Sequence, residues 1–152
     1  MKKTSENPHI HDVPDAQFVL HPEDNDVFIR TGRQIIEACR LSISVGVWLE
    51  ELKEMCSFLA QWCTQRQDKI QACVAVGRGS KVMVFFVPHG SQFNFDLADE
   101  LPDLNRELVT RFNIGMVEVG QIPHSEIERF IDLETARQIY GQIIQTSRTV
   151  EA

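Results

Sequence analysis

The feature that most constrains the fold is a Pro-His phrase that occurs twice, each time at the end of an apolar run. Val87-Pro88-His89 and Ile122-Pro123-His124 place their histidines 35 residues apart, with a helical pattern between them. A strand–helix–strand unit of this length normally makes two parallel strands. We therefore expect His89 and His124 at the same edge of one sheet, beyond the carboxyl ends of the strands, where α/β folds usually carry their sites.

Length and composition indicate one globular domain. The 152 residues have an ordinary apolar content (43%) and an ordinary charge (24%), and a chain of this size can bury a core of its own. No apolar run approaches the roughly 20 residues that span a bilayer, and the first residues lack the apolar region of a signal peptide. We expect a cytoplasmic protein without a membrane partner.

The four cysteines and the charge argue against a cysteine zinc site and against nucleic-acid binding. The cysteines lie within apolar patterns and have no C-x-x-C spacing, which is typical of reduced core thiols and gives no support to a zinc site. The net charge of −7 is spread without a basic stripe, and basic clusters are the main source of nucleic-acid affinity. We expect no cofactor, no bound metal and no direct contact with DNA or RNA.

The chain divides into an arm, a globular part and a tail. Residues 1–26 contain three prolines and six acidic residues but few aliphatic ones, which is typical of a segment without regular structure. We expect a single globular domain over residues 27–147, and we expect residues 148–152 to fray.

The clearest helical pattern extends from about Val47 to Arg66. Its apolar residues recur at steps of three and four: Trp48, Leu52, Met55, Cys56, Leu59, Trp62 and Cys63. Such a stripe is usually core, and the alternative is a face that binds a partner. We expect a shorter helix before it, from about Gly32 to Arg40, with Thr31 as its N-cap.

Three strands are expected in the middle of the chain. Ile70–Val76 and Lys81–Val87 are apolar runs joined by a glycine-containing turn, which predicts a β-hairpin. The second run is continuously apolar and predicts a central strand covered on both faces, and Met116–Val119 is the third strand. Residues 41–47 alternate like a strand but lie between two helical patterns, so we interpret them as a helix end, a short break near Ser44–Gly46 and a new helix.

Further helices are expected in the second half of the chain. They are Pro102–Phe112, with the proline in the first turn, Ser125–Ile131, opened by an S-x-x-E capping box, and Leu133 to about Thr146. We therefore predict an α+β (α/β-like) domain. Two N-terminal helices precede a hairpin and a βαβ unit in a three-stranded mixed sheet, and a C-terminal helix follows.

A sheet of three strands leaves edges exposed, and this bears on the partner. The outer strand of the hairpin or the strand at 116–119 could pair with a second copy. Homodimerisation is a simple way to cover an edge or a tryptophan-bearing face. We therefore expect a protein partner, with a second copy of this chain as one candidate.

The strand-end histidines are the candidates for catalysis. Neutral imidazoles can bind a metal together with carboxylates such as Asp99, and a histidine can act as a general base. Against this, histidines are common in polar loops, and acids such as those at 96–103 also gather at helix N-termini because they favour the helix dipole. His89, His124 and Asp99 are the catalytic residues of this alternative interpretation.

The hairpin turn offers an anion-binding hypothesis. Its backbone amides, with Arg78 and Lys81, could hold an anion. No helix follows the turn, however, and the Walker spacing is missing. A solvated hairpin turn is therefore the competing interpretation.

Two classes of function remain. The favoured one is a non-catalytic interaction or regulatory module that self-associates, because no complete catalytic motif is present. Its candidate binding residues are Trp48, Leu52, Met55, Trp62, Arg78 and Lys81. The alternative is a small metal-dependent or histidine-based hydrolase with its site at the carboxyl ends of the strands.

Overall fold

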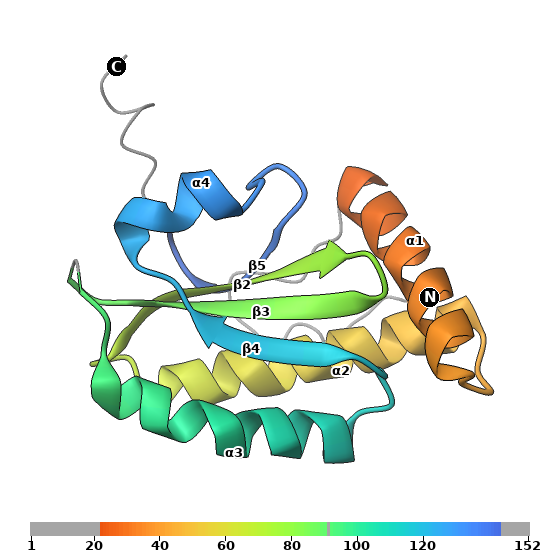
Figure 1. Ribbon diagram of the computed structural model, residues 1–152, viewed down its shortest axis with the longest axis horizontal. Coiled ribbons are helices and arrows are strands. Elements are labelled where there is room, and N and C mark those ends of the chain that lie inside the picture. Colours follow the sequence, from red (N-terminus) through yellow and green to blue (C-terminus); the bar gives the residue numbers. More distant parts are fainter. Residues whose placement is uncertain (1–21, 91, 144–152) are drawn as a thin grey trace, which may run out of the picture.

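The computed structural model describes residues 22–90 and 92–143, with side chains from residue 27 onward (Figure 1). In chain order its elements are α1 (Pro22–Cys39), α2 (Val45–Thr64), β2 (Ile70–Arg78), β3 (Lys81–Pro88), α3 (Phe95–Arg111), β4 (Val117–Gln121), the 3₁₀ turn η3 (His124–Glu126), α4 (Ile127–Phe130) and β5 (Arg137–Gly141). The strands form one sheet in the order β4-β3-β2-β5. The α+β class is confirmed, with one strand more than predicted.

The continuously apolar strand β3 lies in the interior of the sheet. It pairs antiparallel with β2 and parallel with β4, so the predicted hairpin and strand–helix–strand unit are both present. Gly79 in the hairpin turn has a φ of 59°. Glycine adopts this left-handed conformation without the steric cost that a side chain would add.

Helices cover the two faces of the sheet unequally. α2 and α3 lie along one face, and the short α4 lies over the other (Figure 1). The larger core, on the α2 and α3 side, includes Val84 and Phe86 of β3, and the smaller core joins Val87 to Ile127 of α4. No helix in the described part of the chain is both long enough and apolar enough to cross a membrane.

The helix predicted from Leu133 to Thr146 is wrong. Residues Arg137–Gly141 form β5, which pairs antiparallel with β2. Arg137 and Ile139 face inward and are buried, whereas Gln138 between them is exposed. The arginine at an inward position breaks the apolar alternation that marks a strand, and the remaining apolar residues recur at helical spacing.

The first two helices differ from prediction mainly at their starts. α1 begins at Pro22, where a proline fits the first helical position, and Thr31, expected as an N-cap, is buried inside the helix. Ser44 caps α2, since its Oγ accepts a hydrogen bond from the Val47 amide at 3.1 Å. A break between the two helices is present as predicted, but it covers residues 40–44, and Val45 and Gly46, expected in the break, already belong to α2. The rest of the predicted arm, residues 1–21, lies outside the described residues, as does the predicted tail.

The helix α3 also begins earlier than predicted. Its N-cap is Asn94, whose Oδ1 accepts a hydrogen bond from the Leu97 amide at 2.9 Å, so Pro102 lies in the helix interior. A proline there removes one backbone hydrogen bond. The cap and an inner face that continues through Leu97 and Leu101 outweigh this loss. After β4, no side chain caps the short helical segment, so the expected capping box at Ser125 does not form.

The apolar stripe of α2 is part of the protein's own core. Trp48, Leu52 and Met55 are fully buried and Trp62 is nearly so. The indole Nε1 of Trp48 donates to the carbonyl oxygen of Ile114 at 3.0 Å. These four side chains, named above as binding residues, are therefore not available to a partner in this structure.

We expect Gly141→Ala to lower the free energy of unfolding by at least about 2 kcal/mol. Gly141 has a φ of 69°, and an added Cβ would clash with the carbonyl oxygen of Gln71. Gly120→Ala is the matched control, because nothing lies within 4 Å of a Cβ there. Denaturant titration measures both variants. If residues 133–146 formed a helix, Gly141→Ala would instead stabilise the protein by about 1 kcal/mol.

Candidate protein-interaction surface

His89 and His124 follow the carboxyl ends of two parallel strands. β3 ends at Pro88 and β4 at Gln121, and the two strands run in the same direction. The expected placement at one edge of the sheet is confirmed. The exposed ring of His89 has its Nε2 2.8 Å from the carbonyl oxygen of Gln67, and since a carbonyl only accepts, this nitrogen donates.

The structure does not assemble these histidines with Asp99. Asp99 is exposed on α3, and His124 begins η3 with its Nε2 buried and without a hydrogen-bond partner. Within residues 22–90 and 92–143, no three histidine, cysteine or acidic side chains cluster in a way that could hold a metal ion. In favour of the hydrolase interpretation, the described residues show only that the two histidines lie at the same edge of the sheet.

A carboxylate near the end of β3 links α3 to the end of α2, and the sequence did not indicate it. Glu100 accepts hydrogen bonds from Nε of Arg66 at 2.7 Å and from Nζ of Lys69 at 3.0 Å. The Arg66 guanidinium also lies over the ring of Trp62, 3.9 Å from its centroid. Partial burial raises the pKa of Glu100, but the two hydrogen bonds outweigh this effect and hold the pKa below its ordinary value.

We expect Glu100→Gln to lower the unfolding midpoint at neutral pH and to leave it unchanged in acid. Because the folded-state pKa of Glu100 is lowered, its contribution is present above the unfolded pKa, about 4.3. That contribution is lost as the pH falls through the folded-state pKa. Thermal unfolding across this range measures it. Glu107→Gln, which breaks the exposed pair with Arg111, should have little effect, and a deficit of Glu100→Gln that persists in acid would contradict the assignment.

Arg78 and Lys81 lie opposite each other at the base of the hairpin turn. The Arg78 guanidinium donates to the carbonyl oxygen of Phe130 in α4. Lys81 Nζ lies 3.3 Å from the carboxylate of Glu118 in β4. Each cation therefore binds a neighbouring element, and the two do not converge on a shared anion position.

The helix α3 carries a second, mostly apolar stripe that is exposed at Phe95, Pro102 and Val109 and half-buried between them. Its members recur at helical spacing and are Phe95, Ala98, Pro102, the polar Asn105 and Val109; we call this set the α3 stripe. Phe95 is 75% exposed and Val109 is 51% exposed. Exposed apolar side chains that adjoin one another on a surface are a feature of protein-interaction sites, which makes the α3 stripe the candidate surface.

The aromatic end of the α3 stripe is held in place. The rings of Phe93 and Phe95 meet edge to face at 5.3 Å between centroids. Asn94, between them, donates its amide to Oε1 of Gln121 at 2.5 Å, and Nε2 of Gln121 donates back to the carbonyl oxygen of Asn94 at 3.0 Å. These two hydrogen bonds to β4 order the segment before any partner binds, so less conformational entropy is lost on association.

A groove of about 500 Å³ lies between the α3 stripe and the edge of the sheet. It is lined by Ala98, Leu101, Pro102 and Asn105 of α3 and by Glu118 and Val119 of β4. The described residues place no strand beyond β4. An open sheet edge beside an apolar helix face is thus available on the same side of the molecule.

The backbone of β4 presents hydrogen-bonding groups along this edge. The Val82 amide of β3 donates to the Met116 carbonyl at 2.9 Å. In a parallel pair the residues alternate between bonding to the neighbour and pointing away from it. The backbone groups of Val117, Val119 and Gln121 therefore point away from β3, toward the groove.

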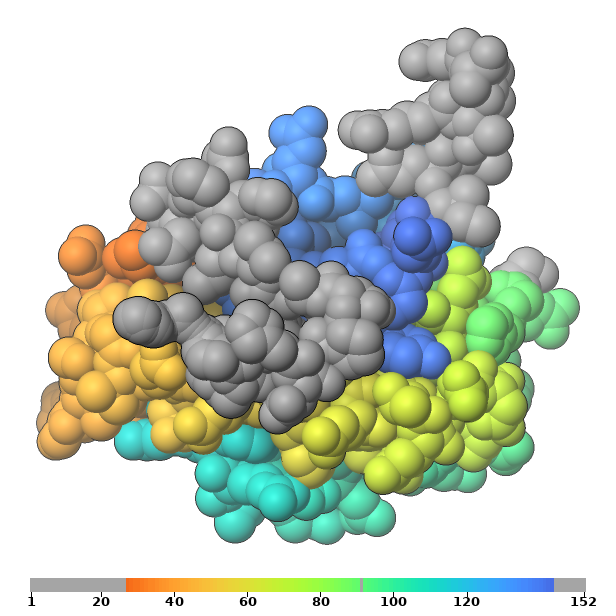
Figure 2. Space-filling view, turned by 180° about the vertical axis from the view of Figure 1, so that it is seen from behind, coloured from red at the N-terminus to blue at the C-terminus, as the bar shows by residue number. Residues whose placement is uncertain are grey.

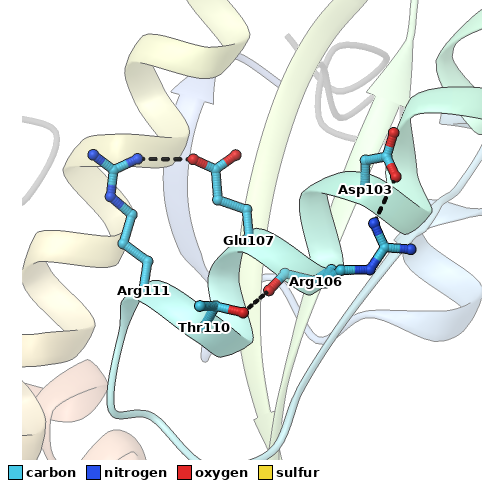
Figure 3. A pocket seen from close by; sticks show the side chains of 5 residues that line it. All are labelled: Asp103, Arg106, Glu107, Thr110 and Arg111. Atoms are coloured by element: carbon cyan, nitrogen blue, oxygen red, sulfur yellow. Dashed lines mark hydrogen bonds and ion pairs between the residues drawn. The ribbon is translucent and has the colours of Figure 1, made fainter.

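On the solvent side of α3, charged side chains form ion pairs with one another (Figure 3). A shallow hollow of about 480 Å³ is lined by Asp103, Arg106, Glu107, Thr110 and Arg111. Arg106 pairs with Asp103 at 2.9 Å, and Arg111 pairs with Glu107 at 2.8 Å. All five residues come from one exposed helix, so the hollow is a solvated helix face that borders the α3 stripe.

A signal for the α3 stripe is present in the sequence. The spacing from Phe95 to Val109 is helical throughout. Because the helix was expected to start at Pro102, Phe95 and Ala98 fell outside it. It was therefore not evident from the sequence that these residues share a helix face with Pro102 and Val109.

A scan against protein-family models returns no match for this chain, and neither does a search of curated proteins or a search of solved structures. The function is therefore argued from the surface itself.

Proposed function

We propose that this chain is a non-catalytic interaction module that forms a homodimer through the α3 stripe. The observation that carries the proposal is the exposed apolar row on a capped helix, beside an open sheet edge. A second copy is the occupant because both the apolar residues and the neighbouring charges of α3 are arranged symmetrically along the helix. Such an interface is isologous, with the same surface contributed by each subunit.

The two large apolar residues of the α3 stripe lie symmetrically about Pro102. Phe95 and Val109 each lie seven positions from it. If two copies of α3 pack antiparallel with the two-fold axis near Pro102, Phe95 of each copy meets Val109 of the other. Ala98 and Asn105 then meet nearer the axis, where smaller side chains let the two helices approach closely.

The charges beside the α3 stripe complement each other in the same arrangement. Asp99 and Arg106 lie on the solvent side of the stripe, on opposite sides of Pro102 along the helix. The antiparallel packing brings Asp99 of each copy near Arg106 of the other. Arg106 now pairs with Asp103 in a highly exposed contact, and such surface pairs contribute little stability, so exchanging the partner has a small cost.

The open edge of β4 lies beside the same two-fold axis. Val119, in the middle of β4, lines the groove together with Pro102. The axis near Pro102 therefore brings the two edges toward each other while the helices pack. The same dimer interface would thus cover both the α3 stripe and the open edge of β4.

We expect the untagged chain to have twice its monomer mass in sedimentation equilibrium, and we expect single charge reversals to weaken the dimer. Asp99→Arg and Arg106→Asp each place like charges across the axis, and each acts twice. Either variant should raise the dimer dissociation constant at least about tenfold, a change of about 1.4 kcal/mol. The double variant Asp99→Arg/Arg106→Asp restores opposite charges and should recover most of the affinity.

Glu134→Arg is the matched control, because it makes the same charge change at an exposed residue outside α3. Phe95→Glu tests the apolar contact and should give a folded monomer. A wild-type chain that stays monomeric at its highest soluble concentration would contradict the proposal. Reversals that weaken the dimer without recovery in the double variant would contradict the antiparallel arrangement.

A further inference from the structure

The two edges of the described sheet differ in their regularity. β4 lies on the side toward the viewer in Figure 1, and Figure 2 shows the opposite side, where the last described residues (blue), from β5 onward, reach the surface. The pairing of β5 with β2 shifts its register between Cys73 and Val74, and irregularities of this kind hinder the addition of a further strand. β4 pairs with β3 from Val117 to Gln121 without a shift. It is therefore the edge better suited to a further strand.

The outward backbone groups of β4 are fixed by hydrogen bonds at both ends of the strand. At its start, the Val82 amide donates to the Met116 carbonyl, and at its end the Ile122 amide donates to the Phe86 carbonyl at 3.0 Å. The even-numbered residues therefore bond to β3, and the odd-numbered ones direct an amide and a carbonyl outward. Within the described part of the chain, no segment bonds to these outward groups, which belong to Val117, Val119 and Gln121.

A second copy of β4 fits these groups in an antiparallel arrangement. With a two-fold axis at Val119, this residue lies opposite Val119 of the other copy, and Val117 lies opposite Gln121. All three residues direct their backbone groups outward, so each outward amide meets an outward carbonyl. These pairs are the hydrogen-bonded pairs of an antiparallel ladder.

The side chains on the other face of β4 favour this register over its neighbours. With the axis at Val119, Glu118 lies opposite Gly120 of the other copy, where nothing lies within 4 Å of an added Cβ. An axis at Glu118 would place the two carboxylates directly opposite each other, and like charges in that position destabilise a sheet. An axis at Gly120 would place Pro123, which has no amide proton, opposite Val117.

We propose that β4 of each copy pairs antiparallel with β4 of the other about Val119, so that two four-stranded sheets become one continuous sheet. This inference rests on the homodimer proposed above and adds the strand contact and its register. The same two-fold axis serves both layers, because Val119 and Pro102 line one groove. An axis perpendicular to the sheet at this point makes β4 and α3 each antiparallel to its own copy.

Cysteine cross-linking on the full chain tests the register. Glu118 and Gly120 form a non-hydrogen-bonded pair across the axis, with Cα atoms about 4.5 Å apart, which is within the range of a disulfide. The double variant Glu118→Cys/Gly120→Cys, oxidised with diamide, should migrate as a covalent dimer on a non-reducing gel. Each single variant should remain monomeric there, because its cysteine lies opposite a residue without a thiol.

Two controls set the background of the cross-linking. The wild-type chain measures cross-links through its own cysteines, and Glu134→Cys measures random collision at an exposed residue outside β4. A double variant that cross-links no more than Glu134→Cys overturns the proposed pairing. Efficient cross-linking of Glu118→Cys alone or of Gly120→Cys alone places the axis at that residue and overturns the register.

Hydrogen exchange of the Val119 amide tests the pairing without a cysteine. This amide should exchange at least about tenfold more slowly in the wild-type dimer than in the monomeric variant Phe95→Glu, because only the dimer gives it an acceptor. The Ile122 amide, which is bonded to β3 in both states, is the internal control. A Val119 amide that is equally slow in the monomer shows that this chain covers its own edge and overturns the proposal.

The failure of this inference can be told apart from the failure of the proposed function. A wild-type dimer with a fast Val119 amide and no cross-link in the double variant overturns the strand pairing and leaves the homodimer through the α3 stripe standing. A wild-type chain that stays monomeric overturns both.

Discussion

The structure depends on covering β3, fully on the face that packs on α2 and α3 and partly on the face toward α4. This strand is apolar at almost every position and pairs with a strand on each side, so leaving its faces in water would cost a large part of the hydrophobic stabilisation. α2 and α3 supply one cover, and the segment around α4 supplies the other. The positions of the remaining elements follow from this requirement, including the open edge at β4, which is the next strand outward.

Much of this architecture could be predicted because it is recorded in local patterns. The continuous run in β3 indicated an interior strand, the glycine turn indicated a hairpin, and the spacing of the two Pro-His phrases indicated parallel strands. β5 could not be found in this way, because Arg137 occupies an inward position where an apolar residue is expected. The start of α3 was misplaced because Pro102 resembles a helix start. The Asn94 cap and the leucines of the inner face decide otherwise.

The candidate site was less accessible to sequence reasoning than the fold. His89 and His124 were placed correctly at one edge, but whether side chains meet is decided by packing between distant segments. The stripe of α2 and the α3 stripe look alike in sequence, since both are apolar at helical spacing. Only the tertiary structure shows that the first is enclosed in the main core, whereas the second lies on the outer side of α3 next to β4.

The two tryptophans of the chain are both core residues, and neither belongs to the α3 stripe. Trp48 is bonded to the backbone before β4, and Trp62 contacts Phe86 of β3 at 5.2 Å between centroids. Their fluorescence therefore reports the integrity of the core and is insensitive to what happens on the outer surface of α3. Folding of this protein can therefore be followed separately from the proposed association, without attaching a label.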